Sequence, residues 1–116
     1  IQFNENIPDF ELDKERIFSR LLDLAIKEDI SIEEGFNSRF SVKGENKDEV
    51  KRFFSKELRG FVNQNDKYHI ESSNNVILVF RYFRVMSVTE VEELVSFGDQ
   101  LTKQFHKCLN NPKENP

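Results

Sequence analysis

The chain has 116 residues, of which 33% are charged, and a formal net charge of −4. This length fits one domain that can bury roughly two thirds of the surface that its unfolded form exposes. The 17 lysines and arginines are spread among 21 acids, so the clustered basic face of a nucleic-acid-binding protein is absent and we predict no nucleic-acid partner. No apolar run reaches the about 20 residues needed to span a bilayer.

The first twelve residues predict an N-terminal arm or edge strand. Pro8 lacks the backbone N–H that a central strand uses, and it favours an extended conformation at Ile7. Asp13 is then a suitable N-cap, and the apolar residues after it recur with helical spacing. We therefore predict a buried helix over residues 13–29.

The middle of the chain predicts a strand followed by a helix. Apolar and polar residues alternate over residues 36–44, which is typical of a half-buried strand. From Asn46 the period becomes that of an amphipathic helix over residues 47–61, with Glu49 placed for a capping box and Gly60 near the end. If the strands on either side of this helix are parallel, they form a right-handed crossover.

An antiparallel hairpin is predicted over residues 67–85. The polar cluster at residues 72–75 supplies side chains that favour turns and tolerate positive φ. The segment that follows, residues 76–80, is apolar at every position, as in a strand that is covered on both faces. We therefore predict that this segment is the central strand.

The last predicted element is a helix over residues 88–109, followed by a polar tail at residues 111–116. Ser87 and Glu90 have the spacing of a capping box. Gly98 falls on the apolar stripe, where a glycine costs about 1 kcal/mol relative to alanine, so we expect a strand or another helix to approach closely there. The apolar stripe comprises Val91, Leu94, Val95, Leu101, Phe105 and Leu109.

Neither histidine belongs to a catalytic or metal-binding pattern. His69 alternates with Lys67 and Glu71 on the polar side of a predicted strand, so we expect it at the surface. His106 and Cys108 are two residues apart on a helix, and their side chains point about 200° apart, too far to share a metal. No nucleotide-binding, metalloprotease or hydrolase motif is present. We therefore predict no catalytic residue, no metal, no cofactor and no enzymatic activity.

The most specific prediction of an interaction surface concerns residues 81–85, at the end of the predicted hairpin. On a strand, Arg81, Phe83 and Val85 share one face, which would present an aromatic ring beside a guanidinium group. Such a face could dock a peptide or stack a base. The ordinary alternative is that arginine stems simply cover apolar surface while their charged ends stay in water.

One further pattern runs through the chain. It consists of Pro8-Asp9-Phe10-Glu11-Leu12, then Phe36-x-x-Arg39-Phe40-x-Val42-x-Gly44-Glu45, the Phe53-Phe54 helix and an apolar hairpin strand. This order resembles a group of uncharacterised bacterial proteins in which such a domain follows predicted membrane-spanning segments. The resemblance covers roughly residues 8–105, and its motifs are structural, so it carries no catalytic or binding residue to this chain. It implies a soluble domain held beside a bilayer by an anchor upstream of Ile1. The only cysteine, Cys108, cannot form an internal disulfide, which favours a reducing compartment, so we expect the domain on the cytoplasmic side.

These patterns together predict a single α+β domain over residues 13–110. We expect a two-layer sandwich with a three- or four-stranded mixed sheet and about three helices mainly on one face. The expected function is non-enzymatic protein–protein interaction or self-association, because the strand that begins at Val76 has more apolar surface than burial on one side uses. The alternative is a small-molecule or lipid-binding domain with a pocket between helix 13–29 and the sheet.

Overall fold

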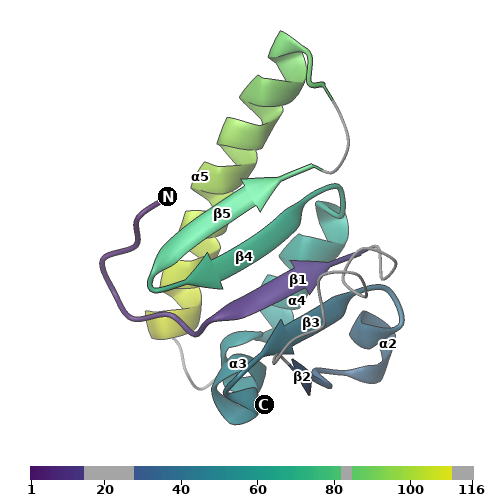
Figure 1. Cartoon of the computed structure of the whole chain (residues 1–116), viewed down its shortest axis with the longest axis vertical. Coiled ribbons are helices and arrows are strands. Elements are labelled where there is room, and N and C mark those ends of the chain that lie inside the picture. Colours follow the sequence, from purple (N-terminus) through teal and green to yellow (C-terminus); the bar gives the residue numbers. More distant parts are fainter. Residues whose placement is uncertain (15–27, 82–84, 111–116) are drawn as a thin grey trace.

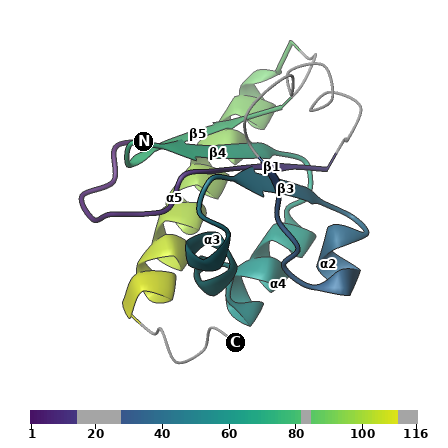
Figure 2. The same cartoon turned by 60° about the horizontal axis from the view of Figure 1, so that its bottom comes forward.

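A five-stranded sheet with helices packed on one face forms the centre of the molecule (Figure 1). The computed structural model describes residues 1–14, 28–81 and 85–110. The strands are β1 (Phe10–Asp13), β2 (Glu28–Asp29), β3 (Ser41–Gly44), β4 (His69–Ser73) and β5 (Val76–Phe80), and the helices are α2 (Glu34–Asn37), α3 (Lys47–Phe53), α4 (Lys56–Gln64) and α5 (Val88–Asn110). Figure 2 shows α3, α4 and α5 together on the same side of the sheet. The predicted two-layer α+β fold is therefore confirmed.

The sheet is larger than predicted, and its described pairings are all antiparallel. Its strand order is β2-β3-β1-β4-β5. Strands β3 and β4 run in the same direction, as a crossover through α3 and α4 would require, but β1 lies between them and pairs with both. The prediction of a mixed sheet was therefore wrong, because the N-terminal segment separates the two parallel strands.

The structure reverses the predicted places of two strands. The segment predicted as an arm or edge strand contributes β1, which is the middle strand, and the predicted central strand, β5, is the last of the five. Pro8 precedes β1, so its missing N–H removes no bond from the sheet. Phe10 and Leu12 are fully buried, whereas Val76 and Leu78 of β5 are 43% and 51% exposed. The continuous apolar run of β5 thus reflects exposed apolar side chains and not burial on both faces.

The two ends of the segment predicted as a helix, residues 13–29, belong to strands. Asp13 is the last residue of β1 and not a helix N-cap. Residues 15–27 lie outside the described part of the chain, as does the predicted tail at residues 111–116. The predicted helix therefore stays a prediction for residues 15–27, while residues 28 and 29 form the short strand β2.

The alternating segment at residues 36–44 divides into a helical turn and a strand. Phe36 belongs to α2, and its ring stacks on that of Phe40 with 4.9 Å between centroids. Strand β3 begins only at Ser41. A spacing of four residues places two side chains on the same side of either a helix or a strand, so the pattern at this point was ambiguous.

The helix predicted over residues 47–61 is two helices. Asn46 caps α3 as predicted, since its side chain accepts a hydrogen bond of 3.1 Å from the backbone amide of Glu49. The helix stops at Phe54, and Ser55 then caps α4, which continues past Gly60 to Gln64. This break brings the ring of Phe54 to 5.0 Å from the ring of Phe10 on β1.

Alanine at two glycines is expected to have opposite effects on stability. A Cβ at Gly44 would lie 2.8 Å from the carbonyl oxygen of Asp9 and 3.2 Å from side-chain carbons of Ile30 and Val50, so we expect Gly44→Ala to destabilise the fold by about 1–3 kcal/mol. A Cβ at Gly60 meets no atom within 4 Å, so Gly60→Ala should stabilise α4 by up to about 1 kcal/mol. Urea unfolding followed by circular dichroism measures both, and a shift of the same sign in both variants would contradict this packing of the two glycines.

Helix α5 has the predicted cap but a different buried face. Ser87 and Glu90 form the reciprocal capping box, with bonds of 3.2 and 3.0 Å. A Cβ at Gly98 would lie 3.1 Å from a side-chain carbon of Ile1, so the segment that approaches this glycine is the N-terminal arm. The buried residues are Phe97, Gly98, Leu101, Phe105 and Cys108. Val91 and Val95, which were predicted as part of the buried stripe, are exposed.

Candidate functional site

The predicted interaction residues Arg81, Phe83 and Val85 follow the last described strand in the sequence. Strand β5 ends at Phe80, and Phe83 is outside the described residues. The guanidinium group of Arg81 donates a hydrogen bond of 2.9 Å to the carboxylate of Glu90, which ties the end of the hairpin to α5. Val85 is 98% exposed. Of the predicted surface, Val85 is therefore accessible, and Arg81 serves as a link between two elements.

The sheet face opposite α3, α4 and α5 carries a cluster of charged side chains around His69. Atom Nδ1 of His69 lies 3.0 Å from Oδ1 of Asp13, and Nε2 lies 3.3 Å from Oε2 of Glu71. The side chains of His69 and Asp13 are only 6% and 7% exposed. The ring of Phe80, opposite His69 in the β4–β5 pairing, stacks on the imidazole at 4.4 Å. The prediction that His69 lies at the surface was therefore wrong.

The carboxylates of Asp13 and Glu71 determine the chemical environment of His69. Burial by itself lowers the pKa of His69, but the hydrogen bonds and charges of Asp13 and Glu71 outweigh that effect and raise its pKa above the ordinary value. When the ring is protonated, both nitrogens donate to these carboxylates and neither keeps a lone pair for a base or for a metal. Within the described ranges, no group of three or more His, Cys, Asp or Glu residues could hold a metal ion. Both ring nitrogens of His69 therefore have carboxylate partners within the protein.

The raised pKa of His69 predicts that stability falls as the pH rises above the unfolded-state pKa of this residue. The stabilisation by the protonated ring is fully present below the unfolded-state pKa of about 6.5, and it is lost as the pH rises through the higher folded-state pKa. Urea unfolding from pH 6 to 9 should show this loss in the wild type and a flatter profile in His69→Gln. Parallel profiles for the two proteins would contradict the assignment.

The second histidine has no such environment. His106 Nδ1 lies 3.1 Å from a carboxylate oxygen of Glu5, and both side chains are about half exposed. Cys108 is buried, and its sulfur lies 3.5 Å from the hydroxyl oxygen of Ser55. As predicted from their spacing on the helix, the two residues point to different surroundings.

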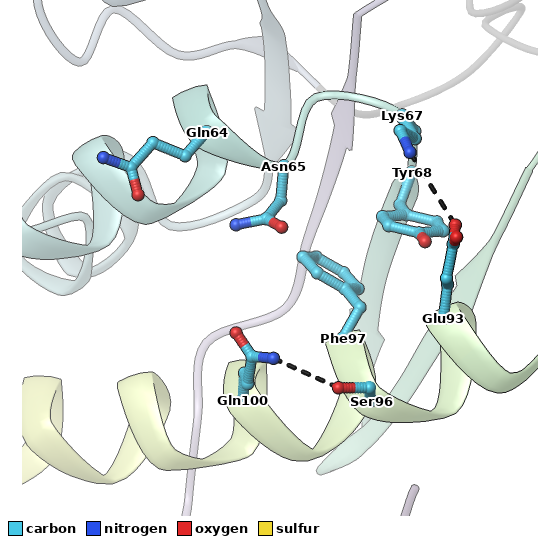
Figure 3. Close-up of a pocket in the computed structure, with 8 residues that line it drawn as sticks. All are labelled: Gln64, Asn65, Lys67, Tyr68, Glu93, Ser96, Phe97 and Gln100. Carbon is cyan, nitrogen blue, oxygen red and sulfur yellow. Dashed lines mark hydrogen bonds and ion pairs between the residues drawn. The ribbon is translucent and has the colours of Figure 1, made fainter.

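A pocket of about 280 Å³ lies where the end of α4 and the following loop meet α5 (Figure 3). Its inner wall is the pair of stacked rings of Tyr68 and Phe97, 4.3 Å apart, and Lys67 approaches Glu93 to 3.8 Å at one side. Burial raises the pKa of Tyr68, and the charge of Glu93 acts in the same direction, so the hydroxyl stays protonated at neutral pH. The lining residues are Gln64, Asn65, Lys67, Tyr68, Glu93, Ser96, Phe97 and Gln100.

This pocket is a weak candidate for a ligand site. Its volume is at the lower limit of those that hold small molecules. Tyr68 and Phe97 are almost fully buried, so their stacked rings offer little free surface to a ligand. It is also not the pocket predicted between helix 13–29 and the sheet. That alternative stays a prediction, because most of the predicted helix lies outside the described residues.

Exposed apolar side chains are concentrated around the outer edge of the sheet. We call them the β5–α5 surface. On α5 the spacing of Val88, Val91 and Val95 places all three on one side of the helix, and they are 76%, 46% and 60% exposed. Figure 1 shows that the N-terminal half of α5 extends beyond the sheet. Ile1 is the remaining member of this surface. Val76 and Leu78 of β5 are also exposed, but they lie on the other face of the sheet, which carries Phe80 and His69.

The N-terminal arm occupies one half of the outer β5 edge. The backbone N–H and C=O of Ile77 both bond to Ile1, at 2.7 Å each, and the amide of Phe3 donates to the carbonyl of Asn75. Backbone groups two residues apart on a strand point to the same edge. The N–H and C=O of Val79 therefore also point to this edge, two residues along β5 from Ile77.

Comparison with known proteins adds no identification: no family model matches this chain, and neither a curated protein nor a solved structure gives a match. The candidate sites therefore rest on geometry. Among them, the β5–α5 surface has accessible apolar groups, whereas the His69 cluster is engaged internally and the pocket is small. Sequence periodicity missed this surface because it assigned Val91 and Val95 to the core.

Proposed function

We propose that this domain is a non-enzymatic protein-binding module and that the β5–α5 surface makes the contact. The observation that supports this most directly is the row of exposed valines on α5, Val88, Val91 and Val95. Burying one side chain of this size stabilises a complex by about 1.5–3 kcal/mol when the burial is complete. Three of them offset part of the entropy that association costs.

We further propose that the domain belongs to a membrane-anchored protein. The support is the resemblance of the sequence pattern to bacterial proteins that carry such a domain after membrane-spanning segments. Along the described part of this chain, no helix has the length and apolar character to cross a bilayer. The reading frame upstream of Ile1 tests the proposal, which fails if that frame encodes no apolar span of about 20 residues.

Site-specific photo-crosslinking in the native host tests the contact surface. A photoreactive residue in place of Val95 is expected to give discrete protein adducts that an excess of unmodified domain competes away. The same residue in place of Lys103, which is also exposed on α5, is the matched control and should give none. Circular dichroism verifies that both variants fold. Identical adducts from the two positions, or no adduct at Val95, would contradict the proposal.

A further inference from the structure

We propose that the outward side of α5 pairs with a basic amphipathic helix of a partner protein. This inference rests on the proposed function and adds the shape and the charge of the bound segment. Two helices pair side by side when apolar residues recur at alternating spacings of three and four, and the residues that flank this seam select the partner by charge. The N-terminal half of α5 has both features and extends beyond the sheet (Figure 1).

Three valines form the apolar seam on α5. Val88, Val91 and Val95 are spaced by three and then by four residues, which is the spacing of the a and d positions in a helix pair. Val88 lies about 180° around the helix axis from the buried Phe97, so this side of α5 faces away from the sheet. A segment paired with the β5 edge does not cover it. The seam is therefore accessible to another helix.

Two acids flank the seam on one side. Glu92 and Asp99 are seven residues apart, so they occupy the same position of successive heptads, and Glu92 lies about 180° around the axis from the buried Leu101. Both side chains are exposed, and among the described residues neither makes an ion pair. Residues 88–99 include no lysine or arginine. The outward side of this half of α5 is therefore apolar and acidic.

These charges specify a separate basic helix and disfavour a second copy of the domain. Antiparallel pairing of two copies would bring Glu92 and Asp99 of one copy beside the same acids of the other, and like charges at an interface are unfavourable. In a parallel pair, Asp99 would face the position of Leu94, which packs against the core of its own domain. A helix that carries lysine or arginine beside its apolar residues complements both acids.

Two designed helical peptides of three heptads test this pairing in NMR titrations of the isotope-labelled domain. Both carry isoleucine and leucine at the seam positions, which are flanked by lysine in one peptide and by glutamate in the other. We expect the lysine peptide to bind at least about tenfold more tightly, because the two acids meet opposite charges in one complex and like charges in the other. It should also gain helicity on binding and shift the amide signals of residues 88–99.

Charge reversal on α5 separates this site from the overall negative charge of the domain. The double variant Glu92→Lys/Asp99→Lys should reverse the preference for the lysine peptide. The matched control is Glu34→Lys/Glu45→Lys, in α2 and directly after β3, on the side of the sheet remote from β5 (Figure 1). It changes the net charge by the same amount and should keep the preference. All four side chains are exposed, and circular dichroism verifies that both variants fold.

Several outcomes would overturn the inference. Equal affinity of the wild type for both peptides would do so, as would the same response in the two double variants. Binding without a gain in peptide helicity would show that the bound segment is not a helix. Self-association of the domain that Val95→Asp abolishes would identify a second copy as the occupant instead. If the crosslinks at Val95 persist while the domain does not prefer the lysine peptide, the protein-binding function stands and the pairing with a basic helix fails.

Discussion

Replacing Asp13 by alanine is expected to destabilise the protein by about 3 kcal/mol at pH 6. Removing one partner of a buried ion pair leaves the other charge without compensation and costs about 3–5 kcal/mol. The lower end applies because His69 keeps its contact with Glu71 and can lose its proton. The destabilisation by Asp13→Ala should therefore decrease as the pH rises, because a neutral imidazole interacts less strongly with the carboxylate of Asp13 than a protonated one does.

A second aspartate provides the control for this experiment. Asp66 accepts from Lys14 at 2.9 Å and from Arg39 at 2.8 Å, but all three side chains are substantially exposed. Exposed ion pairs contribute about 0–1 kcal/mol, so Asp66→Ala should cost less than Asp13→Ala. Chemical unfolding of both variants at pH 6 and pH 8.5 gives the comparison. Equal costs at pH 6 would show that the pairing of Asp13 with His69 contributes no more than a surface pair.

Local features of this fold follow from sequence, because they depend on neighbouring residues. The hairpin turn forms at Asn74 and Asn75, which adopt φ values of 51° and 62°, and asparagine tolerates this region well. The cap at Asn46 and the capping box at Ser87 likewise involve groups three residues apart. The order of the strands does not follow in this way. It depends on which distant segment pairs with which, and the short stretch that forms β1 has too few residues to show a period.

The candidate sites were hidden from sequence analysis for the same physical reason. Asp13 and His69 meet only because β1 pairs with β4, and 56 positions separate them in the chain. On α5, helical periodicity gives the spacing of apolar residues but not the direction in which the helix packs. Phe97 and Leu101 are buried in the core, whereas Val95 is exposed. An exposed apolar row and a buried one have the same spacing, so only the tertiary structure separates them.

Replacing Phe10 by alanine is expected to destabilise the protein by about 3–5 kcal/mol. Its ring is fully buried, and its centroid lies 5.0 Å from that of Phe54, 6.0 Å from that of Phe53 and 6.1 Å from that of Phe105. These rings come from the helical layer, so their contacts with Phe10 join that layer to the middle strand. A cavity at this point cannot close without moving several of them.

This substitution also tests the strand order directly. If the N-terminal segment were a loosely docked arm, Phe10→Ala would change stability little. As part of the middle strand, Phe10 should contribute a large share of the about 5–15 kcal/mol that stabilises a domain. Val88→Ala, at a position that is 76% exposed, is the matched control and should change stability by less than about 0.5 kcal/mol. Urea unfolding of the two variants gives the free energy of unfolding of each and so distinguishes a middle strand from a loosely docked arm. If the N-terminal segment is a middle strand, the loss of the Phe10 ring should cost several times as much stability as the loss of two methyl groups from an exposed valine.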